Sequence, residues 1–187
     1  MCTLPEPRRL PGDLAMWFFI LAELSVFAIL ILAFAVTQVL KPEVFAEGRA
    51  QLDTSTGLAM TSSLLTAGLL AALALQQVRL QRWRRGAGLF VAALLVALVY
   101  VAIKLTEYAH LGAAGLGLEH STFFTLYWIL TGFHFLHVLL GMVILAWLAL
   151  GCWRGGLSVG GLESGVLYWH MVDLVWVVLF PLVYVIG

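Results

Sequence analysis

Eight ionisable side chains inside long apolar runs of this sequence are its best candidates for chemistry. They are Glu23, Lys104, Glu107, His110, His134, His137, His170 and Asp173. A charge at the centre of a membrane helix costs roughly 2.5–3.5 kcal/mol by insertion scales, so each of these groups needs a partner. Imidazoles and carboxylates can bind metal ions, carry protons or hydrogen-bond one another.

The spacing of five of these residues predicts one polar layer near mid-membrane. Glu23 lies nine residues into the first apolar run, which corresponds to a depth of about 14 Å in a helix. His134 and His137 are three residues apart and share a helix face, and His170 and Asp173 repeat that spacing. Three helices therefore present polar groups at comparable depth.

Three interpretations of this layer stay open from the residues alone. A single b-type haem could lie between His170 and either His134 or His137. Buried Glu23 and Asp173 could instead belong to a proton or ion path, as in a small transporter. In the structural interpretation, His170 hydrogen-bonds a carboxylate across the bundle and fixes helix packing.

A second cluster steps by three residues along the outer end of one helix. It consists of Lys104, Glu107 and His110. The opposite charges of Lys104 and Glu107 are close enough on one helix face to neutralise each other.

The elements that position these residues are membrane-spanning helices. The chain is 63% hydrophobic and 11% charged, with a mean hydropathy of +1.02, far above an ordinary soluble domain. Each span needs roughly 20 apolar residues, and no run alternates with the period of a barrel strand. The sequence predicts a single all-α domain over 1–187, a bundle of five transmembrane helices at about 14–40, 57–78, 87–111, 123–150 and 162–186.

Charge distribution excludes some functions and predicts an orientation. Ten basic residues balance ten acidic ones, so no basic surface is available for nucleic acid. Cys2 and Cys152 form no metal or redox motif. The first run is too long for the core of a signal peptide, and we expect it to be retained.

Basic residues crowd one side of the predicted bundle, which places the N-terminus in the cytoplasm and the C-terminus in the periplasm. These are Arg8, Arg9, Arg79, Arg82, Arg84, Arg85 and Arg154.

Four stretches resemble subunit III of the haem-copper oxidases. The segment Thr131–Gly141 carries a Gly-x-His-x-x-His pattern typical of that family, and Tyr168–Trp176 is similar to its last helix. Met16–Glu23 resembles the family helix with a mid-membrane carboxylate, and Glu107-Tyr108 matches its Glu-aromatic pair. All four stretches occur in the family's order, and the resemblance extends over nearly the whole chain.

The resemblance implies an auxiliary subunit of the bacterial inner membrane. Such a subunit has no catalytic, metal or cofactor site of its own, because haem and copper belong to the catalytic partner, and it binds structural phospholipid. A catalytic haem-copper subunit needs six histidine ligands, whereas this chain has five His. By resemblance, Glu23, His134, His137, His170 and Asp173 take the family's interior polar positions.

The resemblance also extends to the second cluster and to a branch of the family. Glu107 takes the position of the acid in the lipid cleft, and Lys104 stands where the longer oxidase subunits usually carry glutamine. We therefore expect Lys104, Glu107 and His110 at a lipid cleft or interface. The five-helix form fits quinol oxidase subunits and the nitric oxide reductase accessory protein NorE, which the opening Pro11–Trp17 and the short loops resemble most.

Overall fold

The structure, a computed structural model, describes residues 14–155 and 157–186, and these residues form only helices and connections. Within this part of the chain, five helical segments are long and apolar enough to cross a membrane, as predicted. They are α1 (Leu14–Leu40), α3 (Thr54–Arg79), α4 (Trp83–Ala113), α5 (Thr122–Arg154), and α6 (Val159–Phe180) continued by the π-helical turn η1 (Pro181–Val185).

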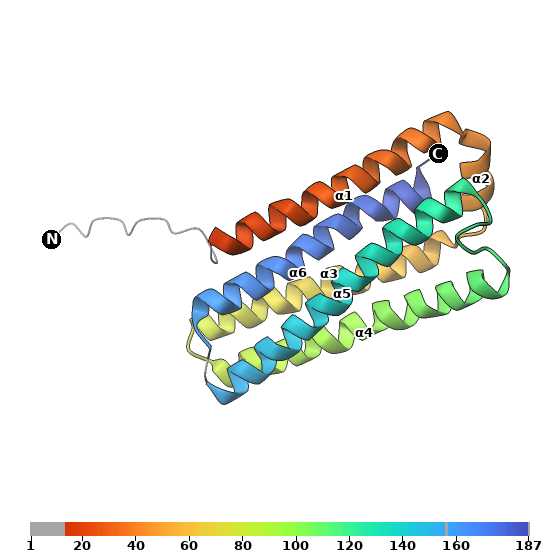
Figure 1. Cartoon of the computed structure of the whole chain (residues 1–187). Helices are drawn as coiled ribbons and strands as arrows, with labels where there is room; N and C mark the ends of the chain where they lie inside the picture. Colours follow the sequence, from red (N-terminus) through yellow and green to blue (C-terminus); the bar gives the residue numbers. More distant parts are fainter. Residues whose placement is uncertain (1–13, 156, 187) are drawn as a thin grey trace.

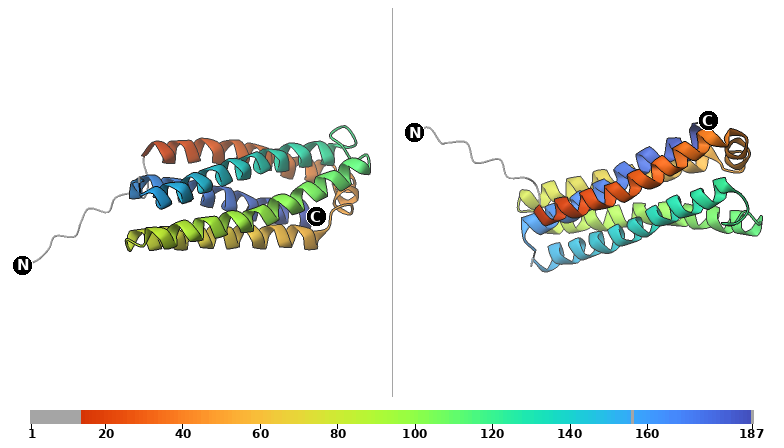
Figure 2. Two further views of the ribbon diagram at one scale, coloured as in Figure 1. Left: turned by 90° about the horizontal axis from the view of Figure 1, so that it is seen from below. Right: turned by 45° about the horizontal axis from the view of Figure 1, so that its top comes forward.

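Helices α3 to α6 form a four-helix group, and α1 lies against its outside (Figure 1). In the group, α3 packs against α4 and α6, and α5 packs against the same two helices. Helix α1 contacts α5 and α6, on the side away from α4 (Figure 2). Its buried residues are Ile20, Phe27 and Phe34, which are seven residues apart and form one narrow stripe.

A short helix that the sequence did not predict, α2 (Pro42–Arg49), lies in the longest connection. Its Phe45 is buried and meets the Phe123 ring edge-on, with 5.3 Å between ring centroids. The Arg49 Nε donates to the Val183 carbonyl oxygen over 3.4 Å, and partial burial lowers the pKa of Arg49. Helix α2 thereby covers one end of the bundle.

The antiparallel order of the helices gathers the basic connections at one end, which we call the arginine-rich end. It holds Arg79, Arg82, Arg84, Arg85 and Arg154. Lys41 and Arg49 lie at the opposite end. The five described arginines on which the predicted orientation rests thus lie at one end of the bundle. Arg8 and Arg9, like Cys2, lie outside the described residues, and the compartment facing each end stays a prediction.

Side chains cap the starts of three long helices. Ser121 accepts from the Phe124 N–H at the start of α5, and Ser158 accepts from the Gly161 N–H at the start of α6. Asp53 caps α3: its carboxylate accepts from the backbone N–H groups of Ser55 and Thr56, each over 3.1 Å.

Asp53 also accepts hydrogen bonds from two hydroxyl groups. The Ser55 hydroxyl donates over 2.6 Å and the Thr56 hydroxyl over 2.5 Å. These side-chain hydrogen bonds, with the backbone ones, lower the pKa of Asp53 from 3.8 to about 2. A lowered pKa means that the ionised cap stabilises the fold above pH 3.8 and that this contribution disappears as the pH falls through about 2.

We therefore expect Asp53→Ala to lower the thermal unfolding midpoint in detergent at neutral pH and to make little difference near pH 2. The measurement is a series of unfolding curves between pH 7 and pH 2 for the wild-type chain and the variant. Asp53→Asn is the matched control, because asparagine caps helices without a charge. A constant gap between the wild-type chain and Asp53→Ala over the whole range would contradict this assignment.

Candidate functional site

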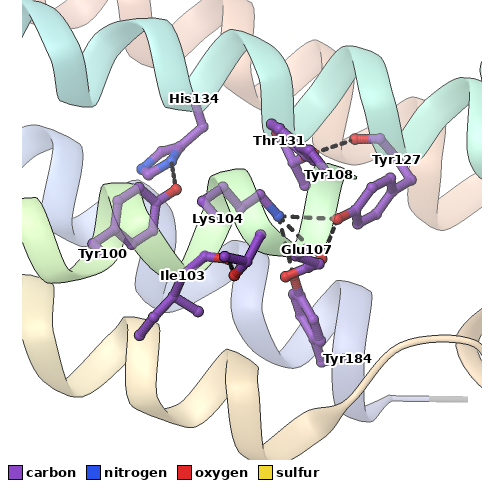
Figure 3. Close-up of polar contacts among 10 residues, drawn as sticks. Tyr100, Ile103, Lys104, Glu107, Tyr108, Tyr127, Thr131, His134 and Tyr184 are labelled. Atoms are coloured by element: carbon purple, nitrogen blue, oxygen red, sulfur yellow. Dashed lines mark hydrogen bonds and ion pairs between the residues drawn. The ribbon is translucent and has the colours of Figure 1, made fainter. Parts of the chain in front are cut away.

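Lys104 lies in the core of the bundle, not at the lipid cleft or interface where we expected it. Its side chain is fully buried and points toward Glu107, Tyr127 and Tyr184 (Figure 3). The ammonium group donates to the Tyr127 hydroxyl over 3.0 Å, to the Tyr184 hydroxyl over 3.1 Å and to the Glu107 carboxylate over 3.4 Å. An ammonium has three N–H donors, so these partners use its full hydrogen-bonding capacity.

Aromatic rings enclose the same ammonium group. The Lys104 Nζ lies 4.8 Å from the centre of the Tyr108 ring and 5.5 Å from that of Trp176, within range of a cation–π interaction. The rings of Tyr127 and Tyr184 lie at 4.9 and 5.8 Å. These rings come from α4, α5, α6 and η1, so the cation holds four elements to one point.

Glu107 balances the charge of Lys104 and also reaches the surface of the bundle. Its carboxylate accepts from the Tyr184 hydroxyl over 2.8 and 3.0 Å and from the Tyr127 hydroxyl. The side chain is 11% exposed and lines an open pocket of about 400 Å³, which Asp53 and His110 also line. His110 is exposed at this pocket, whereas Lys104 is buried in the core.

His134 is fully buried, and both of its ring nitrogens have partners. Nε2 lies 3.2 Å from the Val172 carbonyl oxygen, and Nδ1 lies 3.2 Å from the Tyr100 hydroxyl. A carbonyl only accepts, so Nε2 carries the proton and Nδ1 accepts from the tyrosine. These contacts fix α5 against α6 and α4.

Glu23 and His137 bring an acid and an imidazole of separate spans into contact, whereas the structural interpretation had named His170 as the imidazole. The His137 Nε2 lies 3.0 Å from the Glu23 carboxylate, and Nδ1 donates to the Phe133 carbonyl over 2.8 Å. The proton between them belongs either to an imidazolium beside a carboxylate or to a carboxylic acid beside a neutral ring. The pair is electrically neutral in both states, which suits its position inside the bundle.

His170 does not join this interior layer, which corrects the expectation that it hydrogen-bonds a carboxylate across the bundle. Its side chain is 44% exposed, and its Nδ1 lies 3.7 Å from Asp173 of the same helix, beyond hydrogen-bond length. Asp173 is buried. Helix α6 directs Trp169, Val172 and Asp173 inward. His170 lies about 60° around the helix from Asp173 and about 100° from Trp169, so it falls at the exposed edge of this face.

The site is completed by tyrosines that were not predicted from the sequence. Tyr100, Tyr127 and Tyr184 are all buried and all hydrogen-bond an ionisable group. A signal was available: a lysine inside a span needs partners, and tyrosine hydroxyls are among the polar groups of the other spans.

The imidazoles of His134, His137 and His170 were the candidates for haem or metal binding. The ring nitrogens of His134 and His137 bond protein groups, and the His170 side chain is 44% exposed. Among the described residues, no three His, Cys, Asp or Glu side chains lie close enough to hold a metal ion. The hydrogen bonds of these side chains hold neighbouring helices together, and the Glu23–His137 pair can hold a proton between its two members.

Comparison with known proteins decides the family. The family model described as cytochrome c oxidase subunit III matches residues 12–187. The chain belongs to this family. It is 30% identical over 181 residues to the haem-copper oxidase subunit I+III of Aeropyrum pernix, which covers 92% of this chain and 22% of that protein.

Shorter subunit III relatives match about half of the chain. The cytochrome c oxidase subunit 3 of Synechocystis is 37% identical over 98 residues, which is 49% of this chain and 40% of that protein. A probable quinol oxidase subunit 3 of Staphylococcus aureus is 36% identical over 100 residues, 52% of this chain and 50% of that protein. The matched segments thus span between about a fifth and a half of these relatives.

Proposed function

We propose that this subunit III chain is a non-catalytic accessory subunit that binds the haem-bearing catalytic subunit of a haem-copper enzyme in the bacterial cytoplasmic membrane. The observation that carries the proposal is the set of internal partners found for the buried ionisable groups. Lys104, His134 and His137 bond protein groups at nearly every donor and acceptor, as scaffold residues do. The name of the Aeropyrum relative, subunit I+III, supports a catalytic subunit I as the partner.

The enzyme assisted is, in this proposal, a nitric oxide reductase or a terminal oxidase. The resemblance of Pro11–Trp17 and of the short loops to NorE favours the nitric oxide reductase, and the quinol oxidase relatives favour an oxygen reductase. Nitric oxide and oxygen consumption by the purified complex distinguish the two.

The test is affinity purification of the full chain from its own membranes in mild detergent. We expect a large haem-bearing protein to purify with it, and we expect the separated chain to show no Soret band. A Soret band with stoichiometric iron in the separated chain would replace this proposal with a b-type cytochrome. Recovery of the chain without any haem protein would also overturn it.

Proton transport is the competing function, and hydrogen-bond connectivity argues against it. Hydrogen bonds between the described interior side chains form separate groups, with none linking one group to another. These are the groups centred on Lys104, His134 and His137 and the pairs Tyr108–Thr131 and Trp176–Thr61. We expect vesicles containing the chain to retain an imposed pH gradient as long as empty vesicles do. A leak that Glu23→Gln abolishes would instead identify a proton path through the Glu23–His137 pair.

A further inference from the structure

An exposed groove runs between α3 and α6 at the depth of His170. Two adjoining pockets of about 280 and 340 Å³ form it, and His170 lines both. Its walls are mostly apolar, and Leu69 and Leu174 on the two helices are 60% and 58% exposed. The groove ends toward the arginine-rich end at an ion pair of 2.6 Å between Arg79 and Glu163.

The polar groups in this groove are incompletely paired. His170 lies 11 residues after the start of α6, about 16 Å along the helix and therefore far from either membrane surface. Its imidazole is 44% exposed there. The Asp173 side chain is 93% buried, and its Oδ1 has no hydrogen-bond partner among the described residues. Hydrocarbon supplies no hydrogen bonds, so contact with lipid would leave the imidazole unsatisfied.

Small residues on α3 give a second helix room to approach. Gly68 and Ala72 are four residues apart and line the two pockets, the spacing at which small residues allow close contact between membrane helices. At Gly68 an added Cβ would collide with the Asp173 carboxylate, so glycine is what lets the acid lie against α3.

We propose that the α3–α6 groove is the docking surface for a transmembrane helix of the catalytic subunit, and that this helix places a hydrogen-bonding side chain against the His170–Asp173 pair. The inference rests on the proposed function. A protein helix fits better than a lipid because acyl chains carry no donor or acceptor, and lipid headgroups lie at the membrane surface and not at the depth of His170. The hydrogen bond and the close approach at Gly68 would together select the partner helix.

Photo-crosslinking tests the surface directly. A photoreactive amino acid is placed at Leu174 in the groove or, as a matched control, at Val99 on α4. Both positions are half exposed or more, and they lie about 22 and 24 Å along their helices from the arginine-rich end. After irradiation of membranes we expect Leu174, and not Val99, to crosslink to the haem-bearing subunit.

Other outcomes overturn the inference and separate it from the proposed function. If the haem protein purifies with the chain but Leu174 gives no crosslink to it, the groove is not the interface, although the proposed function stands. A crosslinked pair of these chains through Leu174 would make the groove a contact between copies. If no haem protein purifies with the unmodified chain, both proposals fail.

His170→Phe provides a second test that separates docking from folding. In the isolated chain the imidazole has only a long contact with Asp173, so we expect the unfolding midpoint to stay constant or rise. Recovery of the haem-bearing subunit should fall roughly three- to ten-fold, the size expected for one hydrogen bond between membrane helices. His110→Phe, at the pocket beside Glu107, should change neither value. A destabilised chain with full recovery of its partner would assign His170 a role in folding instead.

Discussion

Replacement of Lys104 by methionine is expected to lower the free energy of unfolding by about 3–5 kcal/mol, the usual cost of removing one member of a buried ion pair. The lysine is fully buried, and its loss leaves the Glu107 carboxylate beside two tyrosines with no cation. The aromatic rings around Nζ would lose their cation–π contacts as well. Chemical or thermal unfolding of the purified chain in detergent measures the difference.

A double variant identifies the cause of this loss. Lys104→Met combined with Glu107→Gln removes both charges, so we expect it to be more stable than Lys104→Met alone. Lys41→Met is the surface control: Lys41 is exposed and donates one hydrogen bond to Thr122, so its effect should stay within about 0.5 kcal/mol. If the two core substitutions simply added their costs, the lysine would stabilise the bundle by packing and not by charge.

Much of the fold follows from the length of the apolar runs, because only helices satisfy the backbone inside a membrane. The first helix ends at Leu40, where its apolar run stops at Lys41-Pro42. Helix α4 begins at Trp83, four residues before its predicted start, because Arg84 and Arg85 continue the helix beyond the apolar segment. An apolar run measures the part of a helix that lies in hydrocarbon, and the helix itself extends into the polar region.

The sequence indicates which buried residues need a partner, but it does not identify most of those partners. Lys104 lies 23 residues from Tyr127 and 80 from Tyr184, and helical periodicity does not relate positions on different helices. A contact such as that of Glu23 with His137 can be anticipated from the sequence, because the two residues lie at a similar depth in their helices. For His170 and Asp173, the shared face was evident, but its rotation depends on the packing of Trp169 and Trp176 in the core.

Close contact between α5 and α6 depends on Gly141, and Gly141→Ala is expected to lower the free energy of unfolding by about 1–3 kcal/mol through overpacking. A Cβ at this position would lie 2.9 Å from Cε3 and 3.1 Å from Cζ3 of Trp169, and 3.4 Å from a ring carbon of Tyr168. Both aromatic side chains are buried, so they cannot move into solvent or lipid to make room. The helices must separate, which also strains the contact of His134 with the Val172 carbonyl.

The same helix offers a matched control for this substitution at Gly132, where an added Cβ meets no atom within 4 Å. Alanine is a better helix former than glycine by roughly 0.5–1 kcal/mol, so we expect Gly132→Ala to leave the chain unchanged or slightly more stable. Opposite effects of one methyl group at two positions of α5 would show that contact with α6, and not helix propensity, sets the cost. Equal effects at Gly132 and Gly141 in detergent unfolding would contradict the close approach of Trp169, because they would place both glycines in open surroundings.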